Sequence, residues 1–284
     1  MLIPAVLRVL GHQRWLRGRT RLVSALYPPD LARKTPFEVE YDGLKYRGHL
    51  ANQLDRNVYF FGGYAPDEIA LLRDLSALMR DRRGTVTLYD VGANVGHHTM
   101  LLSAHVDEVI AFEPMPANRA ALEDKIVLNG LPNVRVFPVA LSDRAGSASM
   151  IIPNPTNPGE AQISTHPGGV VVETVRGDDL VRSARLPRID LLKVDVEGHE
   201  PEVLAGLAET LRRDRPCVLL EASEVAMRKF GGADGLRSTL YSDHVLFSLR
   251  PTRRSYRLEP YNPRSWEVLC APAELAEAVG RLPA

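Results

Sequence analysis

Cysteine is scarce in this sequence, which has only Cys217 and Cys270 among 284 residues. The two lie far apart, each inside an apolar stretch, so we expect buried, reduced thiols in strands, with a disulfide as the alternative. No cysteine pair has the spacing of a metal site, and no apolar run approaches the ~20 residues that cross a bilayer. The sequence therefore favours a chain without a transmembrane helix or a cysteine-bound metal.

Excess charge is lacking as well, because 35 basic residues balance 35 acidic ones. Nucleic-acid-binding domains usually carry a basic excess, so a nucleic-acid partner is disfavoured. A composition of 45% apolar and 25% charged residues is ordinary for a globular protein. The length favours one main domain, which we place at residues 85–284. An extension over residues 1–84 would precede it, with a basic helical arm, a small hairpin and a helix.

The first 28 residues depart from the charge balance, since they hold five arginines, including Arg14, and no acidic residue. Apolar residues recur there at helical spacing from Ile3 to Leu26. Such a segment could rest on an anionic membrane surface, but the favoured interpretation is a helix packed on the catalytic domain or a frayed arm. A cleaved signal peptide fits poorly, because no apolar core precedes a small-residue cleavage site. We expect a cytoplasmic protein, with peripheral contact to the inner face of the membrane through residues 1–28 left open.

From residue 86 onward strands and helices alternate. Strands are expected at 86–91, 109–112, 134–139, 189–196 and 217–221, with helices at 98–105, 118–129 and 201–213. This alternation predicts an α/β fold with a mostly parallel sheet. Before it, residues 36–59 read as strand-like with a hairpin turn at Gly43, and an apolar stripe predicts a helix over 69–83.

Two segments fall outside the alternation. The tail holds short strands at 245–249, 256–258 and 267–269 without helices between them, which suits antiparallel strands at the edge of the sheet. The Pro- and Gly-rich stretch over residues 152–170 is longer than an ordinary connection, so we expect either a functional lid or a disordered loop there.

The most informative motif follows the first strand of the alternation and reads Asp90-Val-Gly-Ala-Asn-Val-Gly96. In open α/β sheets ligands bind beyond the carboxyl ends of the strands, and glycines let the backbone turn tightly beside a ligand. The next strand ends at Glu113, about where an acidic residue meets a ribose hydroxyl. An adenosine-containing ligand is expected here. Plain turn glycines and a surface carboxylate are the structural alternatives.

This loop favours S-adenosylmethionine over NAD. A pyrophosphate requires G-x-G-x-x-G at a helix N-terminus, and here Asn94 and His97 stand at the second and third glycine positions. Asp90 at the strand tip is suited to act near the ammonium group of the methionine part. Residues 140–143, after the third strand, would lie near the adenine, with a plain turn at Ser142 as the alternative.

At these residues the sequence resembles the FkbM family of methyltransferases. The resemblance covers about residues 59–221, on the motifs 90–96, Ala111-Phe-Glu-Pro-Met-Pro116, Asn129-Gly-Leu-Pro-Asn-Val134, Asp178-Asp179-Leu180 and Leu192-Lys-Val-Asp-Val-Glu-Gly-His-Glu200. It implies a class I, Rossmann-like fold: a seven-stranded sheet with helices on both faces and an antiparallel edge. It also implies S-adenosyl-L-methionine as cofactor and O-methylation of a sugar, glycolipid or polyketide-type acceptor. The predicted cofactor-binding residues are Asp90, Gly92, Ala93, Asn94, Gly96, Glu113, Pro114, Asn118, Ala140, Leu141, Ser142 and Asp195.

Four further positions predict the catalytic face. Methyl transfer requires the acceptor oxygen to be held against the methyl carbon and its proton to be removed. Acidic and histidine side chains at the tips of the fourth and fifth strands suit that chemistry, and these are Asp195, Glu197, His199 and Glu221. Asp195 is expected to face the cofactor, and either Glu197 or His199 to reach the hydroxyl. A helix cap for His199 and a buried structural carboxylate for Glu221 are the alternatives.

No metal is predicted. His97 and His98 are adjacent, so on a helix they point about 100° apart and rarely bind one ion together. A divalent ion held by Asp195 and its neighbours is the alternative. Competing functions are an NAD- or nucleotide-sugar-dependent oxidoreductase, a non-catalytic adenosyl-ligand module and an N-methyltransferase. The expected partner is a small-molecule, glycan or lipid-linked acceptor, whose identity, like the oligomeric state, the sequence does not specify.

Overall fold

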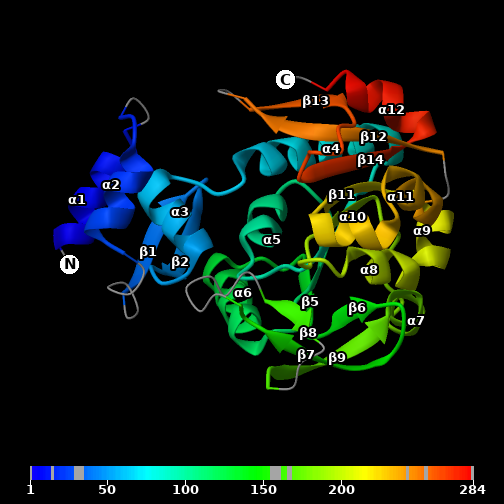
Figure 1. Ribbon diagram of the computed structural model, residues 1–284, viewed down its shortest axis with the longest axis horizontal. Coiled ribbons are helices and arrows are strands. Elements are labelled where there is room, and N and C mark those ends of the chain that lie inside the picture. The colour runs from blue at the N-terminus through cyan, green and yellow to red at the C-terminus, as the bar shows by residue number, and fades with distance from the viewer. Residues whose placement is uncertain are drawn as a thin grey trace.

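The computed structural model describes residues 2–13, 16–28, 35–153, 161–164, 168–240, 243–252 and 255–282. A large α/β unit holds most of the chain, and a smaller N-terminal unit lies beside it (Figure 1, blue). Arg14 of the basic arm and most of the Pro- and Gly-rich stretch, residues 154–160 and 165–167, lie outside the described residues.

The N-terminal unit consists of α1 (Leu2–Gly11), α2 (Arg19–Leu26), β1 (Pro36–Tyr41), β2 (Leu44–His49) and α3 (Gln53–Phe61). The expected hairpin is confirmed, with Gly43 in the left-handed region at its turn. The strand-like reading of residues 53–59 is wrong, because this segment is α3. The side chain of Asn52 accepts a hydrogen bond from the Asp55 N–H and so starts the helix.

The main unit begins with α4 (Pro66–Arg83) and continues with β3 (Thr87–Val91), α5 (His97–Leu102), β4 (Glu108–Phe112), α6 (Pro116–Asn129) and β5 (Val134–Phe137). After a second sheet come α7 (Gly177–Ser183), β10 (Leu191–Val194), α8 (Glu200–Gly206), α9 (Ala208–Asp214) and β11 (Cys217–Glu221). The chain continues through α10 (Glu224–Phe230), α11 (Ala233–Thr239), β12 (His244–Pro251), β13 (Tyr256–Pro260), β14 (Glu267–Pro272) and α12 (Ala273–Gly280).

In the described chain the main sheet has eight strands in the order β13-β12-β14-β11-β10-β3-β4-β5. The five from β11 to β5 are parallel neighbours, β14 runs antiparallel between β11 and β12, and β13 forms an antiparallel edge. The predicted α/β, Rossmann-like class is therefore confirmed. The sheet has eight strands where the resemblance implied seven, and all three strands expected in the tail are present. Cys217 and Cys270 are buried free thiols on β11 and β14, as expected.

Helices cover both faces of this sheet because successive strand residues point to opposite sides. Leu88 and Leu191 pack in one cluster with α4, α5 and α12. Their neighbours Tyr89 and Leu192 pack in another with the helices from α7 to α11. The helix α4 belongs by packing to the main unit, although the sequence placed it in the extension, and the division at residue 84 stays a prediction.

A second, four-stranded sheet follows β5 and was not expected. It has the order β6-β9-β7-β8, with β6 (Ala140–Ser142), β7 (Gly146–Ile151), β8 (Gln162–Ser164) and β9 (Val170–Arg176). The strand β8 lies inside the stretch 152–170 that we expected to be one long loop, and it pairs with β7. The expected helix 201–213 is also divided, into α8 and α9. Gly206 packs there against the Ser142 carbonyl, where a Cβ atom would lie 1.9 Å from the oxygen.

The N-terminal unit is held on α6. The Lys45 N–H donates to Asn129 Oδ1 at 2.8 Å, and Asn129 Nδ2 donates back to the Lys45 carbonyl at 2.9 Å. The buried ammonium of Lys125 lies 4.8 Å from the centre of the Tyr46 ring, a cation–π contact. These contacts fix α3 at the same side of the main sheet as the carboxyl ends of its strands.

Candidate active site

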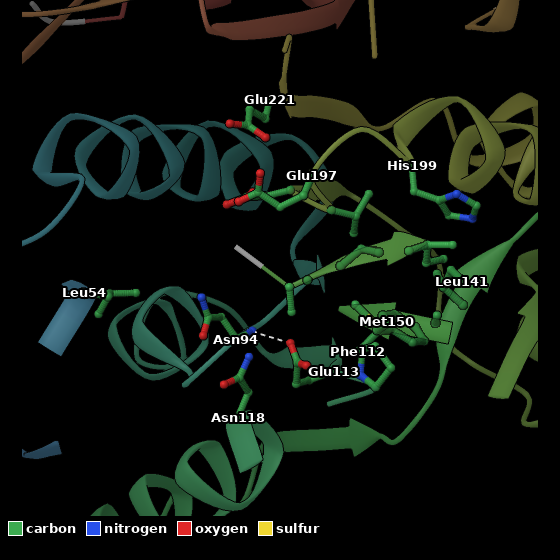
Figure 2. A pocket seen from close by; sticks show the side chains of 18 of the residues that line it. Leu54, Asn94, Phe112, Glu113, Asn118, Leu141, Met150, Glu197, His199 and Glu221 are labelled. Carbon is green, nitrogen blue, oxygen red and sulfur yellow. Dashed lines mark hydrogen bonds between the residues drawn. The ribbon is translucent and has the colours of Figure 1, made fainter. Parts of the chain in front are cut away.

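A cleft opens at the carboxyl ends of β3, β4, β10 and β11. Its lining includes most of the residues predicted from the sequence: Gly92, Asn94, Glu113, Pro114, Asn118, Ala140, Leu141, Asp195, Glu197, His199 and Glu221. Asn94, Glu113 and Asn118 lie at one end of the cleft and Glu197 and Glu221 at the other (Figure 2). Predicted residues missing from the lining are Asp90, Ala93, Gly96 and Ser142.

The glycine loop passes directly over the loop that follows β10. A Cβ atom on Gly92 would lie 1.9 Å from the Asp195 carbonyl oxygen, and the residue has φ +83°. Only glycine fits this crossing. Gly96 has a different role, because a Cβ atom there would lie 2.5 Å from Leu122 Cδ1 of α6. Ala93 is likewise buried and its N–H donates to the Phe112 carbonyl. Gly96 and Ala93 therefore shape the loop rather than line the cleft.

Glu113 organises two backbone segments at the β4 end of the cleft. Its carboxylate accepts from the Asn94 N–H and from the Met115 N–H, each at 2.8 Å. Burial raises the pKa of Glu113 to about 7, although these two hydrogen bonds oppose the rise. A carboxylate oxygen accepts more than one hydrogen bond, so both oxygens keep capacity for a ligand hydroxyl. Pro114 and Asn118 line the cleft beside it.

Asp90 is fully buried beneath the loop. One of its oxygens accepts from the Thr99 hydroxyl at 2.6 Å, and Oδ1 has no hydrogen-bond partner among the described residues. It does not reach the cleft surface, so its proposed action near an ammonium group would require an intervening water.

Lys193 and Asp195 form an ion pair of 2.9 Å at the end of β10. The Lys193 side chain is 4% exposed, whereas that of Asp195 is 40% exposed and faces the cleft. Although partial burial opposes it, the Lys193 ammonium holds the pKa of Asp195 below its usual value. Side chains two residues apart on a strand point to the same face of the sheet. The Lys-Val-Asp pattern therefore contained a signal for this ion pair, and the sequence analysis did not use it.

Three carboxylates meet at the far end of the cleft. One oxygen from each of Asp195, Glu197 and Glu221 lies within 4.8 Å of the others, a spacing at which they could share a divalent cation. Their mutual repulsion also matters. Burial, followed by the charges of Asp195, Glu197 and Glu200, raises the pKa of Glu221 to about 8, and its Oε2 has no hydrogen-bond partner in the described chain. Glu197 reaches this position with φ +54°.

His199 lies apart from these carboxylates, near Leu141 (Figure 2). Its Nε2 is 3.0 Å from the Ser142 hydroxyl and its Nδ1 is 3.5 Å from a Glu202 oxygen. Burial lowers the pKa of His199, so the ring is neutral at pH 7. The structure thus joins Ser142, predicted near the adenine, to His199, predicted near the acceptor. His199 also stands at the N-cap of α8 without a side-chain capping bond.

Glu200 supports the turn that carries Glu197. It is fully buried, and its Oε1 accepts from the N–H groups of Val196 and Gly198 at 3.1 and 3.2 Å.

Several further residues of the cleft were not among the predicted site residues. They are Gln53 and Leu54 of α3, Tyr64, Glu68 of α4, and Glu267 of β14. Tyr64 is held by its carbonyl, which lies 2.9 Å from His97 Nε2. The neighbouring His98 turns instead to Glu68, at 3.1 Å. Glu267 pairs with Glu221 in the sheet, and burial with nearby carboxylates holds its pKa well above the usual value.

Comparison with known proteins shows to which family the chain belongs. Residues 90–258 match the model of the Methyltransferase FkbM domain. The chain is 35% identical over 156 residues to the hexuronic acid methyltransferase AglP of Haloferax volcanii, which covers 51% of this chain and 63% of that protein. It is 34% identical over 147 residues to the 2-O-methyltransferase NoeI of Sinorhizobium fredii, covering 45% and 60%. The matched part thus spans less than two thirds of these relatives.

Among solved structures, the FkbM methyltransferase of Methylobacillus flagellatus aligns at 16% identity with a TM-score of 0.46, over 94% of this chain and 58% of that one. The domain match alone covers more than half of the 284 residues. This chain belongs to the FkbM methyltransferase family.

Proposed function

We propose that this chain transfers the methyl group of S-adenosylmethionine to a hydroxyl of a saccharide acceptor. The observation that carries the proposal is one continuous cleft with two chemically different ends. Glu113 and Asn118 line the end beyond β4, and three carboxylates line the end beyond β10 and β11. Family membership supports the methyl transfer. The names of the two relatives, a hexuronic acid methyltransferase and a 2-O-methyltransferase, support a sugar hydroxyl as acceptor.

The residues present fit S-adenosylmethionine. Glycine at position 92 leaves the backbone open to a ligand, and the buried Glu113 offers carboxylate oxygens to ribose hydroxyls. The carboxylate-rich end suits a ligand that carries a sulfonium and an ammonium charge. Lys193 is paired with Asp195 and so offsets only one of these carboxylates. When bound, the cofactor supplies an electrophilic methyl group.

Glu221 is our candidate for the residue that takes the proton of the acceptor hydroxyl. A carboxylate with a pKa of about 8 is a stronger base than an ordinary glutamate, and a base matched to the working pH contributes on the order of 10²–10⁴-fold. Its unpartnered Oε2 keeps an acceptor site for that proton. Asp195 and Glu197 would orient the hydroxyl from the same end. His199, held by Ser142 and Glu202, would position the acceptor as a neutral hydrogen-bonding group.

Calorimetric titration tests the cofactor half of the proposal. We expect S-adenosylhomocysteine to bind the wild type at micromolar concentration and NAD not to bind. Glu113→Ala should lose the binding. Glu108→Ala, at the other end of β4 and paired with Arg135 on the surface, is the matched control and should keep it. Binding of NAD, or of neither ligand, would contradict the proposal.

Transfer of labelled methyl from S-adenosylmethionine to oligosaccharides that contain uronic acids tests the acceptor half. We expect an ether-linked methyl group in the product, and loss of transfer in Glu221→Gln with cofactor binding retained. Transfer only to amine acceptors would refute O-methylation and leave the cofactor assignment standing.

A further inference from the structure

The outer surface of the N-terminal unit is apolar where a soluble domain would usually be polar. Along α1, Ile3, Val6 and Val9 are 62%, 57% and 64% exposed, and Ala5 is exposed beside them. No charged side chain lies on this exposed arc, because Arg8 is half-buried over the Tyr59 ring. A contiguous apolar face of this kind marks a contact with another surface.

The neighbouring helix also exposes apolar side chains. On α2, Leu22 and Leu26 are 40% and 54% exposed, while Val23 is turned inward and packs with Leu7 of α1 in the small core. The two helices lie together at the end of the molecule farthest from the main sheet (Figure 1). Their apolar residues are therefore not required for packing against the catalytic unit.

The charge of this end identifies the kind of surface that it fits. Five of the 35 basic residues and none of the 35 acidic ones lie in residues 1–28, so the remainder of the chain has five more acidic than basic residues. Arg17 and Arg21 are exposed beside α2. Apolar side chains next to exposed arginines match the interface of an anionic bilayer, where the former enter the acyl boundary and the latter meet phosphates.

The contact must be peripheral. The helix α1 has 10 residues, about 15 Å of helix, which is half the thickness of the hydrocarbon core. No helix among the described residues is long and apolar enough to cross a membrane.

We propose that α1 and α2 dock this protein on an anionic membrane surface, with Ile3, Val6, Val9 and Leu26 inserted and the arginines facing lipid phosphates. The helix α1 packs on α3, and α3 supplies Gln53 and Leu54 to the cleft. Docking would therefore hold at the membrane the unit that supplies this wall of the cleft. The docking itself does not depend on the reaction proposed above.

Flotation of the full chain with vesicles tests the proposal by binding alone. We expect binding to vesicles of phosphatidylcholine with phosphatidylglycerol, little binding to pure phosphatidylcholine, and release by high salt. Val6→Asp with Val9→Asp should reduce binding by roughly tenfold or more, and Arg17→Glu with Arg21→Glu by a similar factor. Val127→Asp is the matched control, because Val127 is 81% exposed on α6 and should leave binding unchanged.

Two results would overturn the proposal. One is equal flotation of the wild type and the Val6→Asp, Val9→Asp variant. The other is a wild type that does not bind vesicles but sediments as a dimer, while the same double substitution makes it a monomer. The apolar face would then contact a second copy of the chain. Unchanged thermal unfolding of each variant shows that its fold is intact.

Discussion

Replacement of Glu221 by glutamine is expected to stabilise the fold at alkaline pH while it removes activity. Glu221 lies among the carboxylates of Asp195, Glu197 and Glu200, and its pKa is raised to about 8 by burial and by their charges. The folded protein keeps a proton there between pH 4.5 and about 8, whereas the unfolded chain has released it. The free energy of unfolding that this group contributes therefore falls as pH rises through that window. Glutamine resembles the protonated carboxyl and removes that loss.

The size of the effect follows from the shift. Each pKa unit corresponds to about 1.4 kcal/mol, so a rise from 4.5 to about 8 sets an upper limit of about 5 kcal/mol. Glu221 is partly exposed, and water screens its charge. We therefore expect Glu221→Gln to gain about 1–2 kcal/mol at pH 9, a rise in Tm of about 2–3 °C.

Thermal unfolding of wild type and variant at about pH 5 and pH 9 measures this gain. The variant should exceed the wild type at pH 9 and differ little from it at pH 5. Glu173→Gln, on the exposed face of β9, removes a carboxylate outside the cluster and serves as the control. A Tm difference that is the same at both pH values, or a variant that is less stable at pH 9, would refute the reasoning.

Three further outcomes are expected. Wild-type kcat/KM should rise with pH and level off above about pH 8, and a steady-state profile that falls over this range would contradict Glu221 as base. Gly92→Ala should cost more than about 3 kcal/mol in urea unfolding because of its close contact with Asp195, whereas Gly130→Ala, with φ +58° and open space, should cost about 1 kcal/mol. Lys193→Met should lower the free energy of unfolding by about 2 kcal/mol and raise the pKa of Asp195, and unfolding measured as a function of pH detects both changes. Equal stability of variant and wild type would show that the ion pair is dispensable.

The sequence by itself determined the central sheet and the acidic residues at the carboxyl edge of its strands. Strand residues that are buried on both faces read as continuous apolar runs, and the acid at the end of each run falls at the carboxyl edge of a parallel sheet. For that reason Glu113, Asp195 and Glu221 could be placed along the same edge of the sheet without coordinates. The glycine pattern also had a local cause, since position 92 tolerates no Cβ atom.

Only the tertiary structure decided which distant segments complete the cleft. Leu54 and Tyr64 reach it because β2 docks on α6 through Asn129, and Glu267 reaches it because β14 pairs with β11. Local periodicity contains no information about such long-range pairings. The same holds for the contact of Ser142 with His199, which forms because the second sheet is packed against α8 at Gly206. The sequence specified the chemical groups, and the folding of remote segments around them determined which groups share one cavity.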